Sequence, residues 1–202
     1  MAIARDPFNL VISGVGGQGN VLMSHLIGGA LLKKGYLVTM ADDIGVSQRA
    51  GAVTSSIRIS QKKSYGPMIP DGHAHFILGL EPLETLRMLN KYGNPKVLTL
   101  TNFQPIFPTS VLNRQHEYPD CNELREAIKD LSQTAWFVDA TQIALNLGAV
   151  IMANVVMIGA SLRTGQLPLT MSDIGHEIKD SFPLERTQLN LEALEIGFNA
   201  MK

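Results

Sequence analysis

Four glycines and two amide side chains lie in one short segment that can bind an anion. The segment follows an apolar run and ends where a helical pattern begins. Its candidate binding residues are Gly14, Gly16, Gly17, Gln18, Gly19 and Asn20. Their G-x-G-x-x-G spacing is typical of a strand-to-helix turn that receives a phosphate, because glycine lets an anion approach the backbone N–H groups at the positive end of the helix. The competing interpretation is a tight turn whose glycines serve packing alone.

A second polar segment adds a positive charge after the next predicted strand. Its candidate binding residues are Ser47, Gln48, Arg49 and Gly51. The guanidinium of Arg49 is always protonated and presents a planar fork that suits a phosphate or the carboxylate of a partner. We therefore expect the glycine turn and the Arg49 loop to form one surface that receives anions.

Two acids favour a different ligand. Asp42 and Asp43 lie near the end of the second predicted strand, where an acid binds the ribose of a nicotinamide dinucleotide. Gln18 and Asn20 count against that ligand, because the nicotinamide fingerprint continues with small and aliphatic residues that pack. From the residues alone, a nicotinamide site stays open as an alternative.

The other reactive side chains predict neither a catalytic centre nor a metal centre. His73 and His75 are two residues apart, but no third ligand with supporting spacing accompanies them. Cys121 is the single cysteine, which excludes internal disulfides and an iron–sulfur cluster held by this chain alone. Asp139 follows a predicted strand, and we favour a helix cap over a ligand contact for it. We assign no catalytic residue and no metal ligand.

The elements that must position these residues alternate along the chain as apolar runs and helical patterns. Strands are predicted over residues 9–13, 36–41, 52–60, 76–80, 96–101 and 135–139. Helices are predicted over residues 20–34, 81–90, 122–131, 140–146 and 154–163, followed by one that Ser172 caps and a last one over 184–201. Residues 42–51 and 102–119 are predicted loops. The helix over 154–163 is apolar nearly all round, so we expect it to be buried between layers or against a second chain.

This alternation predicts an α/β fold, a three-layer Rossmann-like sandwich with a mostly parallel, partly mixed sheet. The strand over 52–60 alternates apolar and polar residues, as a half-exposed antiparallel strand does, which makes the sheet mixed. With 202 residues, the chain is expected to form a single domain over 1–202.

Composition excludes several kinds of partner. The formal net charge is -1, from 17 basic and 18 acidic residues, and no block of Lys or Arg stands out. Electrostatic binding to nucleic acid or to an anionic membrane is therefore not expected. The apolar stretches are too short to cross a bilayer and the N-terminus has no signal-like apolar segment, so we expect a cytoplasmic protein. The low charged fraction of 17% suggests that a partner covers part of the surface.

Two motifs together resemble a known family. The segment "GVGGQGN", the loop "GVSQRAG" and the strand ending in "RIS" are similar to the gamma-type domain of the 2-oxoacid:ferredoxin oxidoreductases, and most similar to the small (beta) subunits that act with indolepyruvate. The resemblance continues through "FILGLEPLETLR" and "ANVVMIGA" to "FPLERTQLNLEAL". The family usually has Arg-Gly-Gly where this chain has Arg49, Ala50 and Gly51, so contacts are carried over to Arg49 and Gly51 and not to Ala50.

The resemblance implies a division of labour between subunits. A large (alpha) catalytic subunit carries thiamine diphosphate and [4Fe-4S] clusters, and the complex converts an arylpyruvate, coenzyme A and oxidised ferredoxin to an aryl-acyl-CoA, carbon dioxide and reduced ferredoxin. This chain is then a subunit without the catalytic centre, inactive alone, that contacts coenzyme A through the glycine turn and the Arg49 loop. Pyruvate, 2-oxoglutarate and branched-chain 2-oxoacids are alternative substrates. A free-standing NAD(P)-binding oxidoreductase and a non-enzymatic nucleotide-binding module are the alternatives from other classes.

Overall fold

The computed structural model describes residues 3, 5–44, 51–107 and 109–201. The strands are β1 (Phe8–Val15), β2 (Leu37–Ile44), β3 (Ala52–Ser60), β4 (Phe76–Gly79), β5 (Leu98–Asn102) and β6 (Thr134–Val138). The helices are α1 (Asn20–Lys33), α2 (Pro82–Tyr92), α3 (Thr109–Leu112), α4 (Cys121–Asp130), α5 (Ala140–Asn146), α6 (Ala153–Arg163), α7 (Met171–Ser181) and α8 (Leu184–Ala200), with a 3-10 turn η1 (Val150–Met152) before α6.

The six strands form one sheet in the order β2-β3-β1-β4-β5-β6. β3 is antiparallel to both of its neighbours, whereas β1, β4, β5 and β6 are parallel to one another. The predicted mixed sheet with one antiparallel strand over 52–60 is therefore confirmed. Inserting β3 between β1 and β2 also moves β2 to the edge of the sheet.

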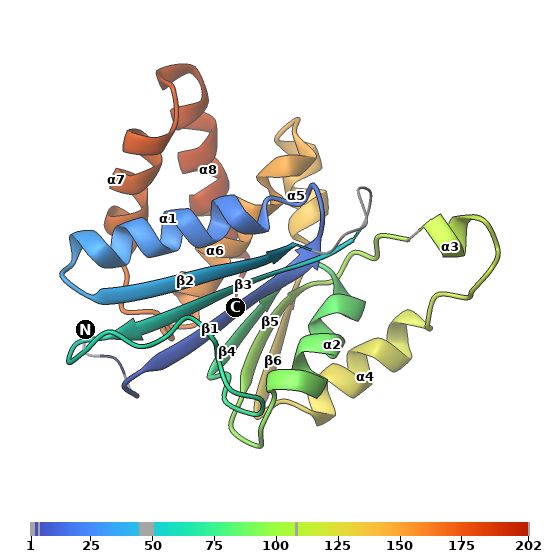
Figure 1. The fold of residues 1–202 in the computed structure, drawn as a ribbon. Coiled ribbons are helices and arrows are strands. Elements are labelled where there is room, and N and C mark those ends of the chain that lie inside the picture. Colours follow the sequence, from blue (N-terminus) through green and yellow to red (C-terminus); the bar gives the residue numbers. More distant parts are fainter. Residues whose placement is uncertain (1–2, 4, 45–50, 108, 202) are drawn as a thin grey trace.

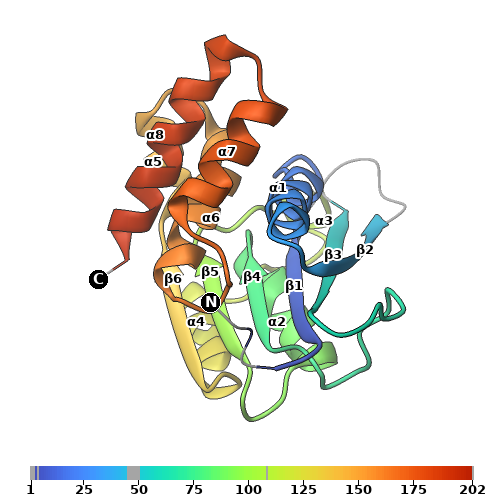
Figure 2. The same ribbon diagram turned by 90° about the vertical axis from the view of Figure 1, so that its left-hand side faces the viewer.

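Helices cover both faces of this sheet (Figure 1). α1, α5 and α6 lie on one face, and α7 and α8 pack outside them, whereas α2 and α4 lie on the other face. The view along the sheet in Figure 2 shows the same three layers, with α8 on the outside. The predicted α/β three-layer sandwich is confirmed.

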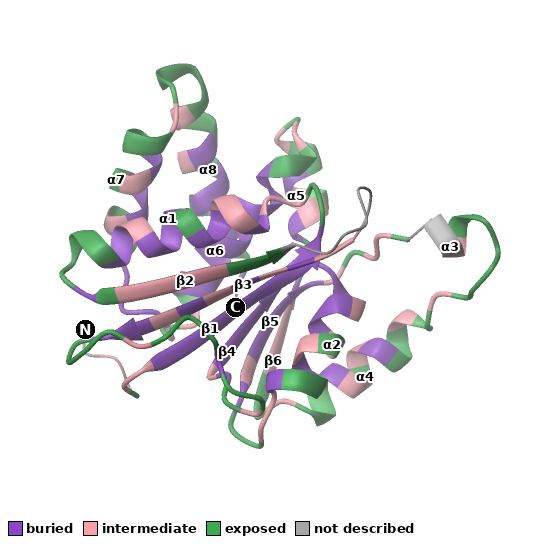
Figure 3. Cartoon of the chain, viewed as in Figure 1, coloured by how far each residue is buried: buried purple, intermediate pink, exposed green. Residues whose placement is uncertain are grey.

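The strands alternate their side chains between two hydrophobic cores, as the two-residue period of a strand requires. Leu10 and Ile12 point into the core beneath α1 and α6, and Val11 between them points into the core beneath α2 and α4. Phe76 and Ile77 divide in the same way. Because β1 and β4 are covered on both faces, they are buried along their whole length, as Figure 3 shows.

α6 is buried on every side by its own chain. Every residue from Ala153 to Leu162 is buried, and α8 lies directly against the helix. The two backbones approach closely, since a Cβ built on Gly159 would be 2.0 Å from the carbonyl oxygen of Leu194. Of the two predicted surroundings for this apolar helix, the structure therefore shows burial between layers.

Several element boundaries differ from the predictions. β2 continues to Ile44, so Asp42 and Asp43 belong to the strand and not to the loop that was predicted to begin at residue 42. The predicted loop over 102–119 contains the one-turn helix α3. The prediction that Ser172 caps α7 is wrong: the cap is Thr170, whose hydroxyl accepts a hydrogen bond from Asp173 N while the Asp173 carboxylate accepts one from Thr170 N. The capping box therefore begins two residues before the serine that the sequence suggested as the cap.

No helix in the described ranges is long and apolar enough to span a bilayer.

Candidate ligand-binding site

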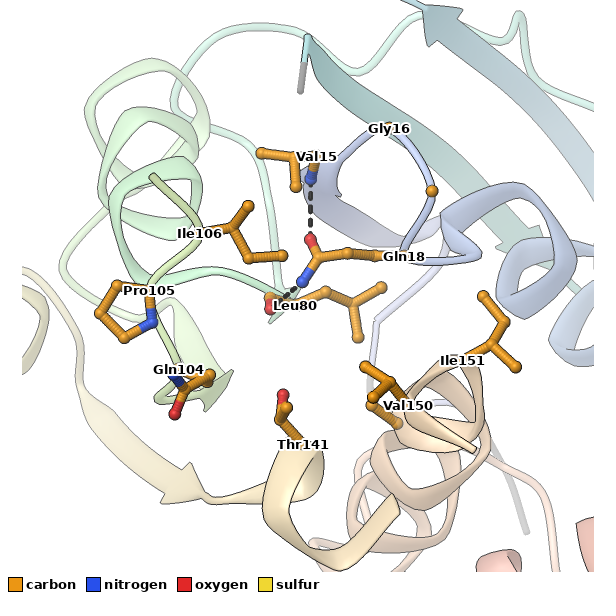
Figure 4. A pocket seen from close by; sticks show the side chains of 12 residues that line it. Val15, Gly16, Gln18, Leu80, Gln104, Pro105, Ile106, Thr141, Val150 and Ile151 are labelled. Carbon is orange, nitrogen blue, oxygen red and sulfur yellow. Dashed lines mark hydrogen bonds between the residues drawn. The ribbon is translucent and has the colours of Figure 1, made fainter. Parts of the chain in front are cut away.

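A cleft of about 490 Å³ opens at the carboxyl edge of the parallel strands, beside the glycine turn. Ligands commonly bind at this edge of an open α/β sheet. Figure 4 shows Gly16 and Gln18 on one side, Gln104, Pro105 and Ile106 on a second side, and Val150 and Ile151 on a third. The full lining is Val15, Gly16, Gly17, Gln18, Leu80, Gln104, Pro105, Ile106, Thr141, Val150, Ile151 and Ala153.

The predicted glycine turn contributes its middle to this cleft. Gly16 and Gly17 are exposed there, while Gln18 is half-buried. Gly14 and Asn20 are buried underneath and do not line the cleft, and Gly19 is half-buried beside it. The structure thus divides the predicted residues into three that face the cleft and three that build the turn.

Three glycines of the turn, of which Gly17 also faces the cleft, are required by the geometry of the turn itself. A Cβ on Gly14 would be 2.5 Å from Gln18 Oε1 and 2.8 Å from Asn20 Oδ1, so this position has no room for a side chain. Gly17 and Gly19 have φ values of 96° and 83°, which only glycine adopts easily. Gly16 differs from these three: its φ lies outside the left-handed region, and among the described residues the nearest atom to an added Cβ is Gly51 O at 3.8 Å.

The amide of Gln18 holds the turn against the floor of the cleft. Its Oε1 accepts from Val15 N at 2.8 Å, and its Nε2 donates to Leu80 O at 2.7 Å (Figure 4). Asn20 Nδ2 donates to Val53 O at 3.0 Å. The sequence predicted that these two amides bind a polar ligand, and the structure shows hydrogen bonds from both of them to the protein's own backbone.

The floor also depends on Asn102, a residue that the sequence analysis missed. Asn102 is fully buried, and its Nδ2 donates to Leu80 O at 3.0 Å and to Thr141 Oγ1 at 2.9 Å. Its Oδ1 accepts from Thr141 N. One side chain therefore ties the ends of β4 and β5 to the start of α5. The signal in the sequence was an asparagine directly after an apolar strand.

The loop that carries the predicted cation lies mostly outside the described residues. Ser47, Gln48 and Arg49 belong to residues 45–50, which are not described. Gly51, the last predicted residue of the loop, is described: its carbonyl oxygen accepts a hydrogen bond from Gly16 N at 2.9 Å. The chain that follows Arg49 is therefore attached to the glycine turn at the cleft.

The described lining is apolar and carries no formal charge. Val150 and Ile151 are about half exposed as residues, at 52% and 50%, on the wall opposite the 104–106 segment. The polar groups are the backbone of Gly16 and Gly17, the amides of Gln18 and Gln104, and the hydroxyl of Thr141. Such a surface suits a ligand with a long apolar portion and a few polar contacts.

The acids that suggested a nicotinamide lie elsewhere. Asp42 and Asp43 line a separate cleft of about 260 Å³ with Lys91 and Tyr92, and none of the turn glycines lines it. In the usual dinucleotide fold the acid-bearing strand is adjacent to β1. Here β3 lies between them, which places the acid-bearing strand about 10 Å from β1 instead of about 5 Å. This geometry disfavours the nicotinamide interpretation.

His75 and Asp139 have structural partners. His75 Nδ1 accepts from Asn9 N at 2.9 Å, and burial, with smaller effects of Arg5 and His73, lowers the pKa of His75 to about 4. Asp139 caps α5, since its carboxylate accepts from Gln142 N at 3.0 Å, as predicted. Within the described part of the chain, no group of three or more His, Cys, Asp or Glu residues is placed to bind a metal ion.

Comparison with known proteins identifies relatives of the whole chain. Residues 9–200 match the family described as pyruvate ferredoxin/flavodoxin oxidoreductase. The indolepyruvate oxidoreductase subunit IorB of Thermococcus kodakarensis is 37% identical over 196 residues, which are 96% of each chain.

Solved structures share the fold. The pyruvate oxidoreductase subunit PORC of Thermotoga maritima superposes with a TM-score of 0.71 at 19% identity, covering 98% of each chain. A 2-oxoglutarate:ferredoxin oxidoreductase of Magnetococcus marinus, solved with 2-oxoglutarate, coenzyme A and succinyl-CoA bound, has a TM-score of 0.74 at 16% identity. The match covers 97% of this chain and 31% of that one, so the present fold corresponds to one part of a larger polypeptide there.

Proposed function

Because the chain belongs to the pyruvate ferredoxin/flavodoxin oxidoreductase family, we propose that it is the small subunit of an indolepyruvate:ferredoxin oxidoreductase. The observation that carries this proposal is the 37% identity to a subunit of that name over 96% of both chains. The chain acts as one gamma-type domain over residues 1–202, and the complex converts an arylpyruvate, coenzyme A and oxidised ferredoxin to an aryl-acyl-CoA, carbon dioxide and reduced ferredoxin.

The redox and decarboxylation chemistry belongs to a larger partner subunit. Iron–sulfur clusters are typically held by four cysteine thiolates, and this chain has Cys121 alone. The donor set here therefore does not fit a [4Fe-4S] cluster. Thiamine diphosphate and the clusters are proposed to lie on the large subunit, with ferredoxin as the acceptor for the complex.

We further propose that the cleft contacts coenzyme A, which supplies the thiol that accepts the acyl group. Its volume of about 490 Å³ lies in the range of small-molecule sites. The exposed backbone at Gly16 and Gly17, at the amino end of α1, suits a phosphate, and the apolar wall of Val150 and Ile151 suits the less polar arm of the molecule. Arg49, two residues before the anchored Gly51, supplies the positive charge that the described lining lacks.

This chain's residues then bind and orient a substrate, and none of them carries out a bond-breaking step. The walls of the cleft exclude water from the bound arm, and the glycine turn fixes the position of the phosphate. The choice among arylpyruvate, pyruvate, 2-oxoglutarate and branched-chain 2-oxoacids depends on the partner, whose residues shape that pocket.

Co-purification tests this proposal. The chain, tagged in its native host, is expected to co-elute with a larger subunit that contains thiamine diphosphate and absorbs as an iron–sulfur protein. The complex is expected to reduce ferredoxin with indolepyruvate only when coenzyme A is present. If the chain instead elutes alone and quenches NADH fluorescence on binding, the nicotinamide alternative is correct and the small-subunit proposal is wrong.

A further inference from the structure

We propose that Tyr118 and Glu81 position the 104–106 wall of the cleft, so that the hydroxyl of Tyr118 is a determinant of coenzyme A affinity although it does not line the cleft. This inference rests on the proposed function of the cleft. It assigns a role to a tyrosine and a carboxylate that the sequence analysis did not single out.

Glu81 is a buried carboxylate between the cleft and α2. It is 1% exposed and follows Leu80, whose carbonyl forms the cleft floor. One carboxylate oxygen, Oε2, accepts from Glu84 N at 2.8 Å and caps α2. A buried carboxylate must have its other oxygen satisfied as well, or it costs free energy. Oε1 therefore needs a hydrogen-bond partner of its own, and a second segment of the chain supplies it.

That second segment is the cleft wall and the chain that returns from it. Oε1 of Glu81 accepts a short hydrogen bond from the Tyr118 hydroxyl, and Ile106 N lies 3.5 Å from the same oxygen. Burial, followed by the hydrogen bond to Glu81, raises the pKa of Tyr118, so the phenol remains a donor at every physiological pH. The Tyr118 ring also meets Phe107 edge to face, with the ring centroids 5.1 Å apart.

The other end of the wall is fixed independently. Phe103 N donates to Val138 O at 2.9 Å, and the Phe103 ring packs edge to face on Phe137 with centroids 5.3 Å apart. The guanidinium of Arg125 lies 4.0 Å from the centroid of Phe103 and 4.4 Å from that of Phe137. Three residues of wall, 104–106, are therefore held between an aromatic–cation contact at one end and the Glu81–Tyr118 pair at the other.

The two ends of the 104–106 wall are held by different kinds of contact. The Phe103 end is held by a backbone hydrogen bond and by ring packing, whereas the Ile106 end depends on Glu81 Oε1, which accepts the hydrogen bond of the Tyr118 hydroxyl and lies 3.5 Å from Ile106 N. Removing a single hydroxyl loosens only the second end. The wall then moves relative to the glycine turn, and ligand contacts that need both sides of the cleft weaken.

The test is the variant Tyr118→Phe in the purified complex, with Tyr65→Phe as the matched control. Tyr118→Phe keeps the ring contact with Phe107 and leaves the Glu81 cap of α2 in place. Tyr65 is also half-buried, its ring lies against Arg58 and Lys63, and no described residue hydrogen-bonds its hydroxyl. The measurements are KM for coenzyme A, kcat, and hydrogen exchange of the peptide covering 103–107.

We expect Tyr118→Phe to raise KM for coenzyme A about tenfold with kcat within about twofold, and to speed exchange at 103–107, while Tyr65→Phe changes none of the three. Unchanged exchange means that Tyr118 does not hold the wall, and faster exchange with unchanged KM means that the wall does not matter for the ligand; either result overturns the inference. A wild-type complex whose activity is independent of coenzyme A defeats the proposed function instead, and the exchange measurement still decides whether Tyr118 holds the wall.

Discussion

The α6–α8 contact and the glycine turn both depend on glycine, but for opposite reasons. At the contact, a Cβ on Gly159 would be 2.0 Å from Leu194 O, and one on Gly197 would be 2.0 Å from Val156 O. Both clashes are with backbone atoms, so a side chain fits only if the two helices separate. At Gly16 in the turn, an added Cβ meets no atom of the described residues nearer than Gly51 O at 3.8 Å.

This difference in the space around the glycines distinguishes positions where the fold requires glycine from a position where ligand binding requires it. The fold has no room for a side chain at Gly159 and Gly197, whereas at Gly16 the described residues leave room and the backbone conformation is ordinary. The open space beside Gly16 belongs to the cleft, so a side chain there occupies the volume that we assign to coenzyme A. Substitutions at the two regions should therefore separate stability from binding.

The largest expected effect on stability is at the helix contact. Gly159→Ala should lower the free energy of unfolding by about 3 kcal/mol or more, because the backbones of α6 and α8 must separate to admit the methyl group. The matched control is Gly175→Ala in α7, where the added Cβ meets Leu191 Cδ2 at 3.5 Å, an ordinary contact. Urea unfolding of the purified chain checks both, and Gly175→Ala should be neutral or slightly stabilising. Equal unfolding midpoints for the two variants would show that the helices are not in close contact.

A smaller effect on the free energy of unfolding is expected when the pH is lowered, because of His75. Its folded pKa of about 4 lies below the ordinary value of 6.5, so the unfolded chain binds a proton that the folded chain does not. Stability should therefore fall as the pH drops from 6.5 towards 4, by up to about 2 kcal/mol between pH 7.5 and pH 5.

The variant His75→Asn isolates this contribution, because the amide oxygen replaces Nδ1 as the acceptor from Asn9 N without titrating. Urea midpoints at the two pH values should differ less for the variant than for the wild type. The same pH dependence in both proteins would mean that His75 is not the group responsible.

A still smaller effect distinguishes the two candidate caps of α7. Thr170→Ala removes the capping hydroxyl and should cost about 1 kcal/mol. Ser172→Ala, on an exposed position inside the helix, should be within about 0.5 kcal/mol of the wild type. Thermal unfolding of the two variants checks the difference. A larger loss from Ser172→Ala would restore the cap that the sequence suggested.

Local patterns were enough to predict the architecture. The two-residue alternation in β3 and the apolar run over residues 10–12 of β1 follow from which strands are covered on one face or on both. The all-apolar α6 pattern predicted burial but left two surroundings open. These two surroundings are distinguished only by the packing of α8, which lies later in the chain, against α6.

The site was predicted in part, because its pieces come from distant segments. The glycine spacing identified one wall of the cleft, since a turn is encoded locally. The other walls, from residues 104–106, Val150 and Ile151, and the buried supports Asn102 and Glu81, depend on long-range packing that no local motif records. The role of Asp42 and Asp43 also depended on strand order, which spacing along the chain does not reveal.

Titration of coenzyme A into the purified complex tests the central claim, that the exposed backbone of the glycine turn faces this ligand. Gly16→Val adds a side chain inside the cleft, and Gly66→Val makes the same change at an exposed position where no atom of the described residues lies within 4 Å of the added Cβ. We predict that Gly16→Val raises the Kd for coenzyme A at least tenfold. Its free energy of unfolding should stay within about 0.5 kcal/mol of the wild type, and Gly66→Val should change neither quantity. A Gly16→Val complex that assembles and binds coenzyme A with wild-type affinity would contradict the claim.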